Sequence, residues 1–160
     1  METTECQTAI VIVGAVSVAE VVPLIDALTA ELASSGYDES EMFGYSVEKL
    51  EQGGVHLIGA SVDGIFVGIG GVELADDGTA ELKRFYVDPL HRRTGVASAI
   101  ITALLAYAAT TGTRVVRLET GLEQHAAIRF YIRHGFERIE PFGPYLASAS
   151  SVCMARQLSG

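Results

Sequence analysis

The first third of the chain combines an apolar run with an amphipathic segment. Residues 10–13 form a β-branched run typical of a strand, and apolar positions then recur at helical spacing from about Val18 to Leu32. Ser17 precedes this helical pattern and is a suitable N-cap. Because Pro23 lies inside the pattern and has no backbone N–H, we expect irregular or kinked first turns. The segment therefore predicts a strand followed by a helix.

Turn signals divide the remainder into short strands and helices. Asp63-Gly64 and Asp76-Asp77-Gly78 each predict a tight hairpin, and Pro89 ends a strand because it offers no N–H to a β-ladder. Strands are predicted at 55–61, 65–74, 80–87, 114–119, 136–139 and 151–158, and helices at 46–51 (capped by Ser46), 95–111 and 125–134. The resulting order, β-α-α-β-β-β-α-β-α-β-β, predicts one α/β domain over residues 1–160, built on a mixed sheet.

The strand predicted at 80–87 breaks the usual alternation of apolar and polar residues. Its apolar positions Leu82, Phe85 and Val87 are spaced three and then two residues apart. One extra residue near Lys83-Arg84 would produce this pattern through a β-bulge, which would redirect the neighbouring side chains. A strand buried on both faces would produce it as well, and the sequence leaves both interpretations open.

Composition favours a reduced, cytoplasmic protein that associates with itself. Hydrophobic residues make up 49% of the chain, and the charged fraction of 19% falls below the roughly 25% of typical soluble domains. This shortage of polar surface predicts a homodimer. Cys6 and Cys153 show no disulfide-framework or metal-ligand spacing, and the four histidines show no metal spacing either. We therefore expect no metal.

No segment of the sequence suggests a membrane span or a secretion signal. The apolar run at 9–19 is shorter than the roughly 20 residues that cross a bilayer as a helix. Glu2 and Glu5 stand where a signal peptide would carry positive charge. We therefore expect no targeting segment and no membrane partner.

Charge is distributed unevenly along the chain. Residues 1–82 contain 15 acidic residues and one lysine, whereas residues 83–160 contain ten basic and five acidic residues. The net charge of −9 argues against nucleic acid as a partner. Four of the 11 basic residues lie between Lys83 and Arg93, where an anionic small molecule could bind. A solvated charged face would explain the same cluster.

A short basic loop connects the predicted strand at 80–87 to the predicted helix at 95–111. The N-terminus of a helix presents unpaired backbone N–H groups and a partial positive charge, which together suit a phosphate or pyrophosphate. Gly95 has no Cβ that would keep an anion from the backbone, and Arg92 and Arg93 add positive charge. The chain contains no P-loop sequence, so the loop predicts a phosphate site of another kind.

The sequence of this loop resembles the first motif of the GNAT superfamily of acetyltransferases. Residues 92–97, RRTGVA, fit the family's pattern of arginine or glutamine, two variable residues, glycine, one variable residue, and glycine or alanine. The resemblance implies that the loop amides bind the pyrophosphate of acetyl-CoA, while the end of the preceding strand pairs with the pantetheine arm as an added strand. The implied cofactor-binding residues are Phe85, Tyr86, Val87, Arg92, Arg93, Thr94, Gly95, Val96 and Ala97. The implied fold is a GNAT-like mixed, mostly antiparallel central sheet flanked by helices.

Residues 124–136 resemble the second GNAT motif. The stretch QHAAIRFYIRHGF keeps the family's alanine, apolar positions, tyrosine and Gly-Phe pair, with Gln124 where asparagine is commonest. By this resemblance Gln124 contacts acetyl-CoA, and Tyr131 is the general acid that protonates the departing thiolate. The structural alternative is a tyrosine packed in the core with its hydroxyl satisfied. Two motifs in the family's order are more specific than either alone.

Two glutamates compete for the role of general base, which must remove a proton from the attacking amine. Glu81 lies 11 residues before Arg92, the spacing at which histone-acetylating members of the family carry their glutamate. Glu119 lies at the end of the next predicted strand and could instead bind the substrate. Either could instead be a structural carboxylate paired with a neighbouring basic residue. The oxyanion of the tetrahedral intermediate would be met by a backbone N–H of the strand that ends at Val87.

The resemblance as a whole implies an acetyl-CoA-dependent N-acetyltransferase that moves an acetyl group to a primary amine of a small molecule or amino-acid-like acceptor. Direct transfer needs no covalent intermediate, so we expect neither cysteine to act as a nucleophile. A CoA-binding sensor or regulatory module on the same fold would keep the binding residues without turnover. Retention of Tyr131 and two candidate bases favours the enzyme. A non-enzymatic interaction domain would require both motifs to be accidental.

Overall fold

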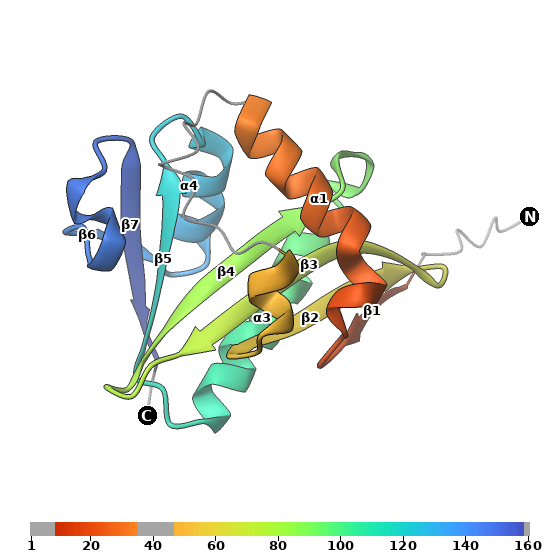
Figure 1. The fold of residues 1–160 in the computed structure, drawn as a ribbon, viewed down its shortest axis with the longest axis horizontal. Helices are drawn as coiled ribbons and strands as arrows, with labels where there is room; N and C mark the ends of the chain where they lie inside the picture. Colours follow the sequence, from red (N-terminus) through yellow and green to blue (C-terminus); the bar gives the residue numbers. More distant parts are fainter. Residues whose placement is uncertain (1–8, 35–46, 159–160) are drawn as a thin grey trace, which may run out of the picture.

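The structure, a computed structural model, describes residues 9–34 and 47–158 and shows a central sheet with helices on both faces (Figure 1). Its strands are β1 (Ile10–Val13), β2 (Val55–Val62), β3 (Ile65–Leu74), β4 (Thr79–Val87), β5 (Val115–Gly121), β6 (Glu137–Ile139) and β7 (Ser151–Gln157). Its helices are α1 (Val18–Ser34), α2 (Val47–Glu51), α3 (Val96–Thr110) and α4 (His125–Arg133), with short 3-10 helices η2 (Pro89–His91) and η3 (Gly143–Ala147). The order of strands and α-helices predicted from the sequence is confirmed.

The seven described strands form one sheet in the order β1-β2-β3-β4-β5-β7-β6. Neighbouring strands are antiparallel except for β4 and β5, which run parallel. A parallel pair needs a long crossover connection, and α3 supplies it between these two strands. The predicted mixed, mostly antiparallel sheet flanked by helices is therefore confirmed.

Apolar side chains cover both faces of the sheet. On one face, α1 packs Val21 and Ile25 into a cluster that includes Ile69 of β3. On the other face, α3 contributes Ile100 and Leu104 to the larger core. Figure 1 shows α1 crossing in front of the sheet and α3 behind it. The middle of the sheet, with β4 in it, is thus packed from both sides.

Strands β4 and β5 pair only at their beginnings. The parallel register joins 79–81 of β4 to 115–117 of β5 and stops there, although β4 continues to Val87 and β5 to Gly121. In Figure 1 the two arrows start together at the lower left and diverge toward their tips. The later half of β4 therefore turns unpaired backbone groups toward β5, which is an open edge inside the sheet.

A β-bulge interrupts β4 just beyond this point. Ile69 pairs with Tyr86 and Gly71 with Lys83, so β4 has one residue more than β3 over the same stretch. Arg84 takes up the extra length with a left-handed φ of 53°. The bulge interpretation of the broken apolar pattern is therefore confirmed, and it sits beside the open edge.

Helix α1 starts where the sequence predicts and extends to Ser34. Its entry is fixed by Glu20, whose carboxylate accepts a hydrogen bond of 2.9 Å from the Ser17 backbone N–H and one of 3.0 Å from the Ser17 hydroxyl. The helix continues through Pro23 without interruption, so the expected irregular opening is not seen as a break. The predicted cap at Ser46 lies outside the described residues.

Within residues 9–34 and 47–158, no helix combines the length and apolar character needed to cross a bilayer. Over the same ranges, no group of three or more His, Cys, Asp and Glu side chains could hold a metal ion.

Candidate active site

The gap between β4 and β5 opens into a cleft of about 890 Å³, within the size range of small-molecule sites. Side chains from α1, β4, β5, α4 and η3 line it, together with the loop before α3. The predicted site residues that line the cleft are Phe85, Tyr86, Val87, Arg92, Arg93, Ala97, Glu119, Gln124 and Tyr131. Thr94, Gly95 and Val96 join the lining residues Arg93 and Ala97, and Glu81 is hydrogen-bonded to the lining residues Lys83 and Tyr145. The structure thus gathers both sequence motifs around one cavity.

The loop before α3 is shaped by two residues with left-handed backbone. Arg93 has a φ of 63° and Gly95, the N-cap of α3, has a φ of 92°. A Cβ added at Gly95 would come near only the Ile10 side chain, at 3.7 Å, so the backbone angle and not crowding requires glycine there. The turn leads directly into the first N–H groups of α3, which have no carbonyl partner within the helix. This arrangement suits a bound phosphate group.

Arg92 connects the loop before α3 to strand β4 and helix α1. Its Nε donates to the Val87 carbonyl at 3.0 Å, its Nη2 lies 2.7 Å from the Glu31 carboxylate of α1, and its guanidinium lies 5.5 Å from the centre of the Tyr86 ring. Arg92 is therefore tied to protein groups on three sides. It joins α1 to the end of β4, while Arg93 stays exposed at the cleft.

Sequence reasoning missed two further basic residues of the cleft. Arg129 and Arg133 are exposed on α4 and line the cavity beside Gln124, which caps that helix without a side-chain hydrogen bond. The two arginines are four residues apart, so they fall on one face of the helix. That spacing, next to a motif already recognised, was the signal available in the sequence. Together with Arg93 they add positive charge to the lining of the cleft, which suits phosphate groups.

Tyr131 is a buried residue of the cleft lining. Its side chain is 8% exposed and packs edge-on against Phe85, Phe130 and Phe136, with ring centres 6.0, 5.4 and 5.8 Å away. Burial, and then the nearby charge of Glu119, raise the pKa of the Tyr131 hydroxyl well above its usual range. Among the described residues, none hydrogen-bonds this hydroxyl. A protonated donor is therefore left available at the cleft.

Glu119 faces the same cavity from β5. Its described hydrogen bond comes from the Ser151 hydroxyl of β7, at 3.0 Å. Burial raises the pKa of the Glu119 carboxyl, the Ser151 hydrogen bond lowers it, and the charges of Glu81 and Lys83 raise and lower it respectively, with burial the largest effect. A carboxylate with a raised pKa and few partners is a better proton acceptor than an ordinary one.

Glu81, by contrast, is engaged by other side chains. Lys83 Nζ lies 2.9 Å from Glu81 Oε1, and the Tyr145 hydroxyl of η3 donates a hydrogen bond to the same oxygen. Lys83 Nζ also donates to the Tyr145 hydroxyl at 3.2 Å. The pairing of Glu81 with Lys83 agrees with the structural alternative that the sequence left open. The Tyr145 contact was not predicted, since 64 residues separate the two partners.

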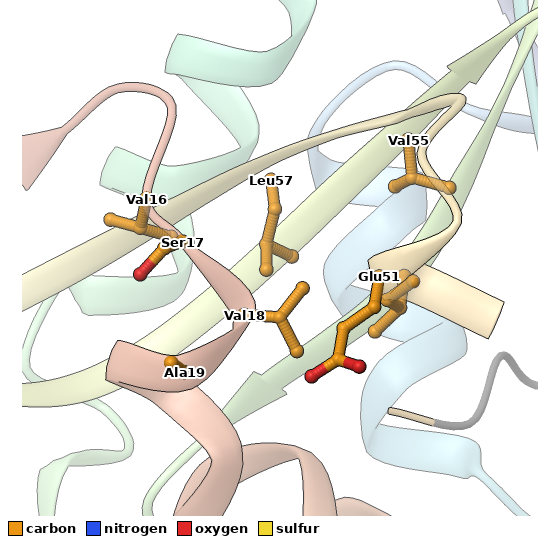
Figure 2. A pocket seen from close by; sticks show the side chains of 8 residues that line it. Val16, Ser17, Val18, Ala19, Glu51, Val55 and Leu57 are labelled. Atoms are coloured by element: carbon orange, nitrogen blue, oxygen red, sulfur yellow. The ribbon is translucent and has the colours of Figure 1, made fainter. Parts of the chain in front are cut away.

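A second cavity, of about 390 Å³, lies between the start of α1, the end of α2 and β2. Figure 2 shows its walls, in which Val18 and Leu57 point toward one another, Val55 stands apart from them and the Glu51 carboxylate lies at the side. None of the predicted catalytic or binding residues lines it. The β4–β5 cleft is therefore the candidate active site.

Comparison with known proteins gives consistent matches. The model of the acetyltransferase (GNAT) family matches residues 24–136. The IAA acetyltransferase of Azospirillum brasilense is 29% identical over 139 residues, which cover 86% of this chain and 90% of that protein. A crystal structure assigned to an acyl-CoA N-acyltransferase of Klebsiella pneumoniae is 33% identical with a TM-score of 0.77, and covers 94% of this chain and 98% of that one. The PaiA N-acetyltransferase of Thermoplasma acidophilum, solved with coenzyme A, has the same fold at a TM-score of 0.74 and 20% identity, over 94% of this chain and 99% of that one.

The chain spans only part of some relatives. It covers 27% and 50% of the length of two further curated proteins, both uncharacterized N-acetyltransferases, matched over 61 and 80 residues.

Proposed function

This chain belongs to the acetyltransferase (GNAT) family, and from this premise we propose that it transfers the acetyl group of acetyl-CoA to a primary amine of a small-molecule or amino-acid-like acceptor. The enzyme is an acetyltransferase, and acetyl-CoA is its cosubstrate. The observation that carries the finer proposal is the separation of β4 from β5. This separation opens one cleft to a phosphate-binding loop, a buried tyrosine and a carboxylate with a raised pKa.

The donor would be bound along the open edge of β4 and the start of α3. The backbone of 85–87 has no β5 partner and would hydrogen-bond the pantetheine arm as an added strand. The amides of 93–97 would hold the pyrophosphate, with Arg93, Arg129 and Arg133 supplying positive charge. Gln124, at the start of α4, would contact the arm from the other wall.

Glu119 is the proposed base. An ammonium cannot attack, so a carboxylate in the cleft must first take its proton, directly or through a water molecule. The amine nitrogen then attacks the thioester carbonyl carbon and forms the C–N bond. Glu119 is favoured over Glu81 because the Glu81 oxygen already accepts hydrogen bonds from Lys83 and Tyr145. A backbone N–H at the β4 bulge would stabilise the oxyanion of the intermediate.

Tyr131 is the proposed acid. When the intermediate collapses, the C–S bond breaks and the sulfur leaves with the electron pair as a thiolate. The apolar surroundings that raise the pKa of Tyr131 also disfavour a bare thiolate, so the phenolic proton moves to sulfur as the bond breaks. The products are the acetylated amine and the free thiol of coenzyme A. Starting from the ammonium, the nitrogen gives up two protons, one to Glu119 before attack and one as the amide forms. One of these restores the Tyr131 hydroxyl and the other leaves to solvent, so the net products are the amide, the thiol and one proton.

An amine panel with detection of released thiol tests this function. Purified enzyme would be incubated with acetyl-CoA and 2-phenylethylamine, spermidine, lysine or glycinamide, with Glu119→Gln as the matched control. We expect thiol release that depends on one class of amine and falls by at least about 10²-fold in the variant. Acetyl-CoA binding in calorimetry without turnover on any amine would instead indicate a CoA-binding module.

Two further properties belong to the proposal. A homodimer is supported by the exposed apolar side chains Val11, Val13 and Ile65 along the β1 edge and the β2–β3 hairpin. Light scattering at micromolar concentration would test it, and a monomeric mass would contradict it. A cytoplasmic location is supported by Cys153, which is a buried free thiol.

A further inference from the structure

Three side chains close a small polar triangle where β4 and β5 separate. Glu81 is the last residue of β4 that pairs with β5, and its carboxylate meets Lys83 Nζ at 2.9 Å. The Tyr145 hydroxyl donates to that carboxylate and accepts from Lys83 Nζ at 3.2 Å. Each member therefore contacts the other two.

The triangle is largely buried, with the Glu81 side chain 17% exposed, and neighbouring rings hold it in place. Tyr145 is 2% exposed and Lys83 is 8% exposed. The charges of Lys83 and Glu81 are therefore shielded from water, and each stabilises the other. The Phe142 ring packs edge-on against Tyr145 with centres 5.2 Å apart, and the Arg117 guanidinium lies 4.1 Å from the centre of Phe142. Helix η3 is therefore fixed on the sheet through the same tyrosine that completes the triangle.

The position of Tyr145 gives the triangle a functional consequence. Tyr145 is one of the residues that line the cleft, and its hydroxyl contacts Glu81 and Lys83 of β4. Glu119 faces this region and is influenced electrostatically by both charged members of the triangle. A change at Tyr145 would therefore alter the part of the cleft next to the proposed base without touching the phosphate-binding loop.

We propose that Tyr145 is the positioning residue for the acceptor amine: it holds Glu81 as the counter-ion of Lys83 and shapes the wall against which the amine meets Glu119. This inference rests on the proposed transfer to an amine. Glu81 acts through its ion pair with the lining residue Lys83 and is not the group that removes the proton. Tyr145 and Glu81 act as one unit, so losing the second after the first has little further effect.

The test is a double-mutant cycle with Tyr145→Phe, Glu81→Gln and the double variant. For whichever of 2-phenylethylamine, spermidine, lysine or glycinamide the wild type acetylates, kcat and KM are measured at saturating acetyl-CoA. We expect each variant to raise the amine KM about tenfold, the size of one hydrogen bond to a charged group. The double variant should resemble Tyr145→Phe, and the Kd for acetyl-CoA should stay within about twofold of wild type.

Tyr107→Phe is the matched control, because Tyr107 lies on α3 and stacks on His56 with ring centres 3.6 Å apart. It should leave the amine KM unchanged. An unchanged amine KM in Tyr145→Phe would overturn the inference while leaving acetyl transfer intact. Equal losses of amine and acetyl-CoA affinity with a lowered Tm would reduce Tyr145 to a structural role. Loss of turnover in Glu81→Gln with retention in Glu119→Gln would make Glu81 the base and overturn it as well. If the wild type acetylates no amine, both proposals fall.

Discussion

The two sides of the cleft are built in different ways. The backbone of the phosphate side comes from one continuous stretch, 85–97, in which the end of the bulged strand β4, a left-handed turn at Gly95 and the start of α3 follow one another. Arg129 and Arg133 of α4 add only side-chain charge to it. The acceptor side is assembled from β4, β5, β7 and η3, with Glu81 meeting Tyr145 across 64 residues and Glu119 meeting Ser151 across 32.

The two sides differ in the kind of group that would contact the substrates, which is the backbone on the phosphate side and side chains on the acceptor side. On the phosphate side, the proposed binding groups are backbone amides, presented by a turn that needs a left-handed φ at Gly95. These residues would act mainly through the backbone conformation that they permit. On the acceptor side, the groups act through buried charges and hydroxyls whose properties depend on distant neighbours. Substitutions on the first side should therefore change donor affinity, and substitutions on the second should change turnover or acceptor affinity.

The largest expected effect is a fall in turnover, and it is expected from a substitution at Tyr131. Tyr131→Phe removes one oxygen and keeps the ring among Phe85, Phe130 and Phe136. If the hydroxyl protonates the leaving thiolate, kcat should fall by about 10²–10⁴. The Kd for acetyl-CoA should change little, because the phosphate side is intact. Steady-state kinetics and calorimetry would measure the two quantities.

Tyr107→Phe again serves as the control for removing a tyrosine hydroxyl elsewhere. The fall in kcat should also be smaller with an acetyl donor whose thiol leaves readily without protonation. An unchanged kcat in Tyr131→Phe would remove the tyrosine from the mechanism and leave the fold and the cosubstrate as they are.

A glycine pair tests the phosphate side. Gly95 and Gly112, at the two ends of α3, have φ values of 92° and 81°, and a Cβ would be crowded at neither. Replacing either by alanine should cost roughly 1 kcal/mol of stability, because alanine disfavours a positive φ. Only Gly95→Ala should weaken acetyl-CoA binding, by about tenfold, since it alters the turn that aims the amides.

Calorimetry and thermal melts would measure affinity and stability for both variants. Equal acetyl-CoA affinity in Gly95→Ala and Gly112→Ala would mean that the turn at Gly95 does not hold the donor.

The contrast also explains what the sequence could predict. Strand 65–74 and the order of elements follow from local periodicity and turn residues, and Gly95 from a motif whose parts are contiguous. The bulge at Arg84 could be predicted as one of two interpretations, because it shifts the apolar spacing of its own strand. The proposed preference for Glu119 over Glu81 could not be predicted from the sequence, because it rests on contacts with Tyr145 and Ser151, which only the folded sheet brings near. Arg129 and Arg133 are an intermediate case. The sequence shows that they are four residues apart, but it does not show that they face the cleft.

The smallest expected effect concerns stability and lies at Glu119. Its pKa is raised in the folded state, chiefly by burial, so the folded protein binds this proton more tightly than the unfolded chain does. The stability contributed by this group is full below the unfolded pKa and is lost as the pH rises through the folded one. At pH 8 the wild type therefore folds with an unfavourable buried charge that Glu119→Gln lacks. We expect the variant to have the higher Tm at pH 8, with the difference shrinking toward pH 4, while turnover falls. The exposed Glu137→Gln should show no such pH-dependent difference. A lower Tm for Glu119→Gln at every pH would mean that the hydrogen bond between Glu119 and Ser151 outweighs the cost of burying the charge. Glu119, the proposed base, would then also stabilise the acceptor side of the cleft.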